Sequence, residues 1–149
     1  MAKKAEEAAG FYCSVIPNSR VDAVTTLPID TPSGPAGTVR VDFTLAGQKF
    51  QAIGAGPLDP FNHAISFLIE CADQAELDRV WSGLLEGGGK PEQCGWLQDR
   101  YGVYWQIVPT GFDAMMGDPD RVRARRVAEA MLKMVKFDVA ALQKAYDGA

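Results

Sequence analysis

Gly47-Gln-Lys-Phe-Gln-Ala-Ile53 and Gly102-Val-Tyr-Trp-Gln-Ile-Val108 decide the fold, because each stretch repeats the pattern of the other 55 positions away. Both contain a turn glycine, two further residues, an aromatic residue, a glutamine and two apolar residues. Alternating residues after a glycine turn are typical of the second strand of a β-hairpin. The match indicates that one unit has been duplicated; a chance likeness of two short hairpins is the alternative interpretation.

A helical segment precedes each of these hairpins, and the two segments also correspond. Ala5-Glu6 with Phe11 matches Ala75-Glu76 with Trp81 at an offset of 70 residues. The helices match at an offset of 70 and the hairpins at an offset of 55. A Pro- and Gly-rich loop at 30–37 explains the difference, because it lengthens the first half between its helix and its hairpin. The repeat therefore extends over both halves of the chain.

The periodicity of apolar residues predicts where helices and strands lie. In the second half, a strand precedes the helix and further strands follow it, which is a βαβββ order. Asp73 is expected to cap the helix of that half, and Asp118-Pro119 and Asp138 are expected to begin two tail helices. The expected helices are 5–16 and 74–85, and the expected strands are 21–27, 39–45, 50–53, 65–71, 94–97 and 103–108.

These elements predict an α+β fold in which two βαβββ modules form a curved, cup-like mixed sheet with the helices outside. The expected boundaries are a first module at 1–56, a second module at 57–110 and a helical tail at 111–149, together forming one structural domain. The first module has no counterpart of the strand at 65–71, so its first strand is missing from this pattern. An uncovered sheet edge invites pairing, and we expect a partner chain, in a homodimer, to cover it.

Composition restricts the classes of function. The chain has 149 residues and a net charge of −4 with no basic block, which argues against nucleic-acid binding. No apolar run reaches the roughly 18 residues of a membrane span, and no signal peptide is evident at the start. Three cysteines without metal-type spacing are typical of a reducing compartment, so a cytoplasmic location is expected.

Several motifs resemble those of the PhnB-like family within the vicinal oxygen chelate superfamily, which includes glyoxalase I and bleomycin-resistance proteins. The resemblance covers nearly the whole chain. Its most specific part is Cys94-Gly-Trp-Leu-Gln-Asp-Arg-Tyr-Gly-Val-Tyr-Trp-Gln-Ile-Val-Pro109. The other stretches that carry it are Ala5–Arg20, Phe61-Asn62, Ala64–Phe67 and Gly87-Gly-Gly89. The resemblance implies the glyoxalase/bleomycin-resistance fold.

The resemblance also implies positions for a divalent metal, since superfamily enzymes bind one through residues on the first and last strands of each module. Those positions correspond here to Gln51, Gln106 and Ala64. Neutral amides are poor substitutes for carboxylates, so we expect no metal and no cofactor, with a divalent metal as the alternative. Such families often carry the label 3-demethylubiquinone-9 3-methyltransferase. Gly87-Gly-Gly89 follows a helix, however, and is interpreted as a C-cap, unlike the loop that binds S-adenosylmethionine.

Two residues are candidates for catalysis. His63 is the single histidine, and its ordinary pKa of about 6.5 suits proton transfer. His63 lies one residue before Ala64, the position that corresponds to a metal ligand, so its side chain is expected to point away from the cup. A plain surface role is the alternative. Cys94 is a candidate nucleophile, although a free cysteine is more often a small buried hydrophobe.

A second set of residues is expected to bind a small ligand. The two glutamines can hydrogen-bond a polar molecule, and the aromatic residues can line the same cavity; roles in sheet packing are the alternatives. The expected ligand-binding residues are Gln51, Gln106, Trp96, Tyr104 and Tyr101.

The function expected from these residues is the binding or transformation of a small polar metabolite in the cup. The alternative is a binding protein that sequesters its ligand without turnover, as bleomycin-resistance proteins do. Methyl transfer is a distant third. The residues do not decide between enzyme and binding protein. Neither nucleic acid nor membrane is an expected partner.

Overall fold

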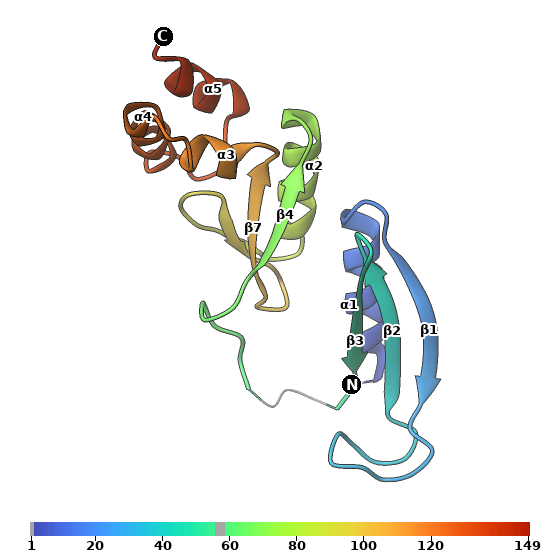
Figure 1. The fold of residues 1–149 in the computed structure, drawn as a ribbon. Helices are drawn as coiled ribbons and strands as arrows, with labels where there is room; N and C mark the ends of the chain where they lie inside the picture. Colours follow the sequence, from blue (N-terminus) through green and yellow to red (C-terminus); the bar gives the residue numbers. More distant parts are fainter. Residues whose placement is uncertain (1, 56–58) are drawn as a thin grey trace. The chain divides into compact units, whose positions relative to one another are not determined.

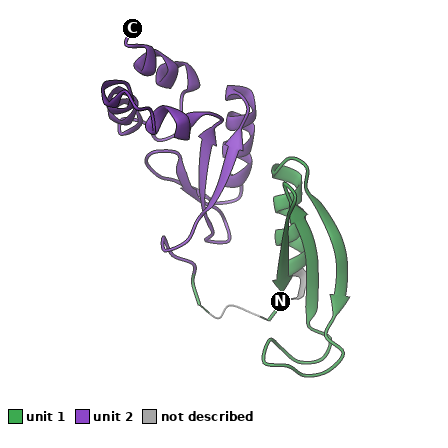
Figure 2. Ribbon diagram, viewed as in Figure 1, with its two compact units in different colours: residues 1–60 green, residues 61–149 purple. Residues whose placement is uncertain are grey.

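Residues 2–55 and 59–149 are described by the computed structural model. The chain separates into two units, residues 1–60 and residues 61–149 (Figure 2). Each unit pairs a sheet with a helix that covers one of its faces (Figure 1).

The first unit contains α1 (Ala2–Val15), β1 (Arg20–Thr26), β2 (Val39–Leu45) and β3 (Gln48–Ile53). Its antiparallel sheet has the order β1-β2-β3. The helix packs mainly on β2, whose alternating residues Val41, Phe43 and Leu45 are buried. A two-residue turn joins β2 to β3, and both of its residues have positive φ, 48° at Ala46 and 87° at Gly47. That combination is the primed hairpin turn, whose twist matches that of the strands.

The second unit contains β4 (Phe67–Cys71), α2 (Gln74–Leu85), β5 (Lys90–Pro91), β6 (Trp96–Gln98) and β7 (Tyr104–Pro109). Its sheet has the order β4-β7-β6-β5, in which β4 runs parallel to β7 and the other neighbours are antiparallel. The βαβββ order predicted for this half is therefore present. In the first unit the described residues show a helix followed by three strands.

The boundaries of α2 agree with the predicted ones because local signals fix both ends. The Asp73 side chain accepts a hydrogen bond from the Glu76 amide at 2.8 Å, and the Glu76 carboxylate accepts one from the Ala72 amide at 2.7 Å. This reciprocal arrangement resembles a capping box. Gly87 and Gly88, with φ of 79° and 116°, then carry the chain from α2 towards β5.

Four apolar residues of α2 are buried against the sheet, where Trp105 and Ile107 of β7 are also buried. Leu97 of β6 completes this layer. The core of the second unit therefore lies between α2 and one face of its sheet. The α2 residues are Leu77, Val80, Trp81 and Leu84.

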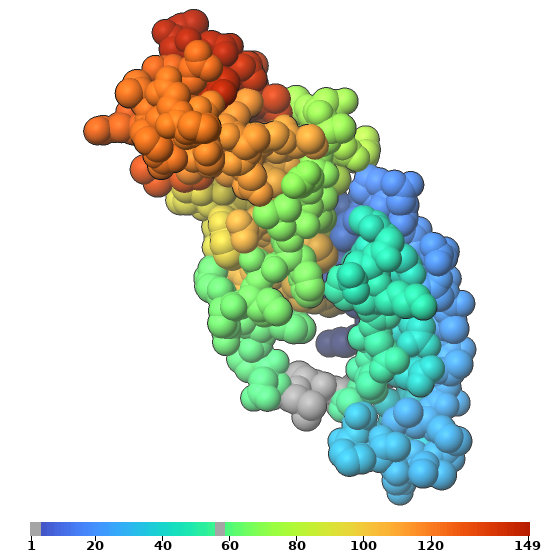
Figure 3. All heavy atoms as spheres, in the orientation of Figure 1, coloured from blue at the N-terminus to red at the C-terminus, as the bar shows by residue number. Residues whose placement is uncertain are grey.

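The tail forms α3 (Phe112–Met116), α4 (Arg121–Met131) and α5 (Val139–Asp147), whose atoms gather at one end of the second unit (Figure 3). Asp138 caps α5 as predicted, and its carboxylate accepts a hydrogen bond from the Ala141 amide at 2.9 Å. The predicted cap at Asp118-Pro119 is wrong. Asp120 caps α4 instead, accepting from the Val122 amide at 2.9 Å.

Several other elements differ from the expectation in their bounds; β6, for example, begins at Trp96 rather than Cys94, and the two-residue β5 was not predicted. The short α3 was not predicted, and β4 begins at Phe67 rather than Ile65. Among the helices that the structure describes, none has the length and apolar character needed to cross a bilayer.

Candidate functional site

The face of the second sheet opposite α2 carries a cluster of aromatic and amide side chains. The register pairs Trp96 with Gln106 and Gln98 with Tyr104, so these residues project from the same face of β6 and β7. All of them are half-buried, whereas the residues that alternate with them face α2 and are buried. We call this surface, formed by Trp96, Gln98, Tyr104 and Gln106, the uncovered face.

His63 lies against this face. Its ring centroid is 3.9 Å from that of Tyr104 and 6.2 Å from that of Trp96. Its Nε2 atom is 2.8 Å from Oε2 of Glu92, and the His63 side chain is 58% exposed. The prediction that His63 points away from this face is wrong, because β4 begins only at Phe67 and strand alternation does not govern residue 63.

Gln106 is held by the segment that leads into β4. Its Nε2 atom donates to Oγ of Ser66 at 2.9 Å. No described residue donates to its amide oxygen, so this acceptor is available to a ligand on the uncovered face. Two aromatic rings, an amide acceptor and an imidazole with a carboxylate partner thus lie together.

This set of groups can bind a small polar molecule and exchange a proton with it. Aromatic rings contact planar or apolar parts of a ligand, and the amide fixes its orientation by hydrogen bonding. A histidine with one ring nitrogen hydrogen-bonded to a carboxylate is oriented for proton transfer through the other nitrogen. Glu92 then stabilises the imidazolium that results.

Gln51 belongs to the first unit and has a different environment. Its Nε2 atom donates to Oδ1 of Asp42 at 2.8 Å on the polar face of that sheet. This hydrogen bond, together with the interaction of Arg40, lowers the pKa of the Asp42 carboxyl below its usual value. The proposed ligand role of Gln51 stays a prediction, and the structure brings it together with Asp42 and Arg40.

Cys94 and Tyr101 lie in the loops that flank β6. Cys94 has a φ of 59°, and its amide donates to the Met134 carbonyl at 2.8 Å, so the tail fixes it. Its Sγ atom lies 3.7 Å from the Met131 carbonyl oxygen. Tyr101 lies in the turn between β6 and β7, where the Arg100 guanidinium is 5.9 Å from its ring centroid. Their suggested roles remain predictions.

The residues present do not fit the divalent metal that the superfamily resemblance implies. Within residues 2–55 and 59–149, no group of three or more His, Cys, Asp and Glu side chains is placed to hold an ion. The amide nitrogens of Gln51 and Gln106 already donate within their own units. Neutral amide oxygens supply little of the charge that a hard cation requires.

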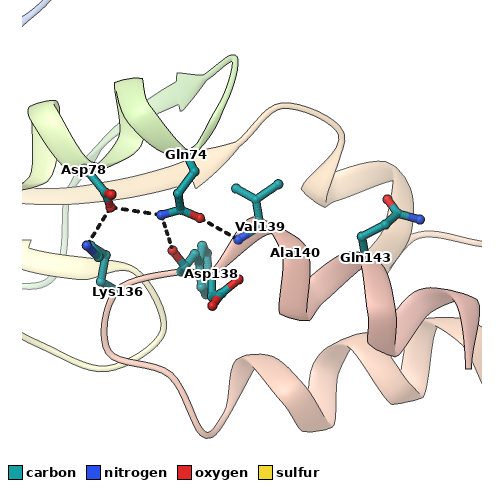
Figure 4. Close-up of a pocket in the computed structure, with 8 residues that line it drawn as sticks. Gln74, Asp78, Lys136, Asp138, Val139, Ala140 and Gln143 are labelled. Atoms are coloured by element: carbon teal, nitrogen blue, oxygen red, sulfur yellow. Dashed lines mark hydrogen bonds and ion pairs between the residues drawn. The ribbon is translucent and has the colours of Figure 1, made fainter. Parts of the chain in front are cut away.

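A hollow of about 720 Å³ lies between α2 and the tail (Figure 4). Its polar groups are engaged with one another. Gln74 donates to Asp78 at 2.9 Å and accepts from the Val139 amide at 2.8 Å, and Asp78 forms an ion pair with Lys136 at 2.5 Å. These contacts hold the tail on α2, so the hollow is better explained as part of the packing interface between α2 and the tail than as a binding site.

Sequence reasoning missed Glu92 and Ser66. Glu92 lies 29 residues from His63, and no motif joins the two. Only the placement of the segment before β4 alongside the loop before β6 reveals the pair. The single histidine was the one signal that pointed to this region.

Comparisons with known proteins agree with this architecture. A family model described as 3-demethylubiquinone-9 3-methyltransferase matches residues 1–108. A Bacillus cereus PhnB protein, provisionally described by the same activity, is 32% identical, with a TM-score of 0.61; the alignment covers 72% of this chain and 92% of that one. The crystal structure of a Pseudomonas aeruginosa protein is 18% identical, with a TM-score of 0.55, and the alignment covers 69% of this chain and 86% of that one.

No curated protein matches the chain. The two solved structures show the same α+β glyoxalase-type fold, and the family model covers more than half of the residues. The chain therefore belongs to the 3-demethylubiquinone-9 3-methyltransferase family, whose members are PhnB-like proteins.

Proposed function

We propose that the uncovered face of the second sheet binds a small polar metabolite that has a planar group and a hydrogen-bond donor. One observation carries the proposal: His63 lies 3.9 Å from the ring of Tyr104 while its Nε2 atom lies 2.8 Å from Glu92. An exposed pair of this kind contributes little to stability. Its position beside Trp96 and Gln106 supports a role in binding.

The ligand is transformed if His63 moves a proton. In its neutral form the imidazole accepts a proton from the bound molecule, and Glu92 then stabilises the charged ring. The alternative is sequestration without turnover. That alternative is supported by the small number of titratable side chains that the described contacts place at this face, namely His63, Glu92 and Tyr104.

Methyl transfer is the activity in the family's description, but the chain's glycine-rich segment does not support it. Gly87-Gly88-Gly89 lies between α2 and β5, and it does not lead from a strand into a helix. For the location we propose the cytoplasm, supported by free thiols at Cys13, Cys71 and Cys94.

Tryptophan fluorescence tests the proposal, because Trp96 is half-buried while Trp81 and Trp105 are only 6% and 3% exposed. The protein is titrated with a panel of small aromatic acids, hydroxy acids and diols, and with S-adenosylmethionine. We expect a member of the panel, other than S-adenosylmethionine, to change the Trp96 signal. The change should disappear in Trp96→Phe, and binding measured by calorimetry should weaken about tenfold in Gln106→Ala.

Two further variants make the result specific. Gln143→Ala alters the hollow beside α5 and should leave binding unchanged. His63→Gln retains a polar contact to Glu92 and should still bind. Product that forms with the wild type and not with His63→Gln identifies an enzyme, and stoichiometric binding without product identifies a sequestering protein. Binding that is insensitive to the changes at Trp96 and Gln106 would place the site elsewhere.

A further inference from the structure

The register of the second sheet extends the uncovered face onto β5. Lys90 pairs with Gln98, and Pro91 pairs with Leu97. Because Leu97 is buried on the side of α2, Lys90 and Gln98 project from the opposite side, which is the uncovered face. Gln98 pairs in turn with Tyr104 of β7. Lys90, Gln98 and Tyr104 therefore form one row across three strands.

The residues on either side of Lys90 fix its backbone. A Cβ atom at Gly89 would lie 2.7 Å from Cα of Leu85 and 3.0 Å from the Gln98 carbonyl oxygen, so the chain passes the end of α2 at a distance that only glycine allows. The ring of Pro91 restricts the next φ. The Lys90 side chain itself is exposed. Its ammonium group is thus mobile on a backbone that is held in place.

Charge is distributed unevenly over the uncovered face. Lys90 lies at one corner, on β5, and Glu70 lies at the opposite corner, on β4, where it pairs with Val108. Glu92 follows Lys90 by two residues, but its carboxylate is 2.8 Å from Nε2 of His63. No carboxylate among the described residues forms an ion pair with Lys90. An anionic group on a ligand would therefore be attracted to the Lys90 corner and repelled from the Glu70 corner.

Beyond the aromatic rings, the face offers hydrogen-bond acceptors. Ser66 engages the amide nitrogen of Gln106 at 2.9 Å, which leaves the amide oxygen of Gln106 as an acceptor. The ionised carboxylate of Glu92 can only accept, so Nε2 of His63 carries a hydrogen and Nδ1 is an acceptor in the neutral ring. A ligand that satisfies these acceptors must carry a donor.

The spacing of the strands limits the size of this ligand. Lys90 and Tyr104 are two strands apart, which corresponds to about 10 Å between their Cα atoms, and Gln106 is about 7 Å further along β7. The flexible four-carbon stem of lysine covers much of the first distance. One aromatic ring with an acidic group at one end and a hydroxyl at the other spans what remains.

We infer that the ligand of the uncovered face is a planar hydroxylated carboxylic acid, whose carboxylate binds Lys90 and whose hydroxyl donates to Gln106. The inference rests on the proposed function and adds the charge and the orientation of the ligand. Its ring lies on Tyr104 and Trp96. Because Lys90 is exposed, the preference for an acid over a neutral molecule is several-fold in size.

Two pairs of probes with matched shapes test the charge of the ligand. The first pair is para-hydroxybenzoate and para-hydroxybenzamide, and the second is the meta isomer of each. Binding to the full chain is measured by calorimetry and by the Trp96 fluorescence change. We expect an acid to bind about fivefold more tightly than its amide. This preference should decline when salt is added to about 0.5 M, because salt screens exposed charges.

Variants assign each end of the ligand to a residue. Lys90→Gln should abolish the preference for the acid, and Lys90→Arg should retain it. Lys133→Gln is the matched control, because it removes the same charge from an exposed position in the tail. para-Methoxybenzoate lacks the donor and should bind the wild type about tenfold more weakly than para-hydroxybenzoate. In Gln106→Ala the two acids should bind equally.

Several results would overturn the inference. One is equal binding of acid and amide by the wild type; if Trp96→Phe abolishes that signal, the proposed function still stands. Another is a preference for the acid that survives in Lys90→Gln or is lost equally in Lys133→Gln. Tighter binding of para-hydroxyphenyl phosphate would assign the anion as a phosphate. If neither acid binds, the inference falls, whereas the proposed function falls only when no member of its own panel changes the Trp96 signal.

Discussion

Asp99 organises the turn between β6 and β7. Its side chain is 3% exposed and accepts hydrogen bonds from the Tyr101 amide at 2.8 Å, the Val103 amide at 3.0 Å and Nε1 of Trp105 at 2.8 Å. The carboxylate thus joins the backbone of the turn to a core side chain. Without it, these buried donors would lose their acceptor.

We therefore expect Asp99→Ala to lower the free energy of unfolding by about 3 kcal/mol. Urea denaturation followed by circular dichroism measures the loss. Glu70→Ala, an exposed position on β4, is the control and should change stability by less than about 0.5 kcal/mol. Equal effects of the two substitutions would contradict the role given to Asp99.

Cys71 has the most perturbed thiol among the described cysteines. The residue is completely buried at the end of β4, and burial, with a smaller effect of the nearby Glu76 carboxylate, raises its thiol pKa from 9.0 to about 11. The folded state therefore keeps this proton at pH values where the unfolded chain releases it. Stability is lost as pH rises from about 9 to 11, because the unfolded state gains the thiolate.

Cys71→Ala should abolish this part of the alkaline loss, which a two-unit shift of pKa sets at roughly 2–3 kcal/mol. The measurement is the free energy of unfolding at pH 8 and at pH 10.5 for both proteins. In the native wild type at pH 8, a thiol reagent should modify Cys71 only after unfolding. Rapid native modification of Cys71 would show that the burial is not maintained in solution.

At the scale of elements, Gly95 fixes the tail to the second sheet. Its φ is 80°, and its amide donates to the Val135 carbonyl at 2.7 Å. A Cβ atom here would lie 2.8 Å from a ring carbon of Phe137 and 2.9 Å from the Ile107 carbonyl oxygen. Phe137 is 1% exposed, so it has little room to move.

Gly95→Ala should consequently destabilise the protein by about 3 kcal/mol and accelerate hydrogen exchange in α4 and α5. Gly111→Ala is the matched control, because its φ of 86° is equally left-handed but no heavy atom lies within 4 Å of the added Cβ. It should cost about 1 kcal/mol. If both variants lost the same stability, the strain would be in the backbone alone and the contact with Phe137 would be unimportant.

The helices show which boundaries local sequence can fix. Asp73 and Glu76 lie three residues apart, and their side chains accept hydrogen bonds from backbone amides at the start of α2. Because these signals are local, α2 was predicted at its observed ends. For α4, two aspartates compete. Asp118 accepts from the Tyr146 hydroxyl and from the Asp120 amide, and Asp120 is left to cap the helix. Because Tyr146 lies on α5, this choice depends on tertiary packing.

At the scale of the whole molecule, metal analysis tests whether the side chains of either unit can hold a divalent ion. No described cluster of His, Cys, Asp and Glu is placed to hold an ion. We expect protein purified without chelator to contain well below one equivalent of divalent metal by mass spectrometry. Its melting temperature should be the same after dialysis against EDTA and after addition of Zn²⁺ or Mn²⁺, since a bound ion would raise it.

One equivalent of metal with a melting temperature lowered by EDTA would contradict this prediction. His63→Gln and Gln106→Ala would then identify the ligands, because loss of a true ligand releases the ion. An unchanged metal content in both variants would point away from the uncovered face.

The sequence by itself determined the repeat, the strand order that follows from it and the buried layer of each sheet. These properties depend on local periodicity. In β2, for example, the alternating residues Val41, Phe43 and Leu45 are the buried ones. The family was also recognisable, since the motif at 94–109 is contiguous. The βαβββ order of the second half needed no contact information.

The tertiary structure alone decided the pairing of His63 with Glu92 and the position of His63 against Tyr104. Strand alternation predicts the direction of a side chain only inside a strand, and residue 63 lies before β4 begins.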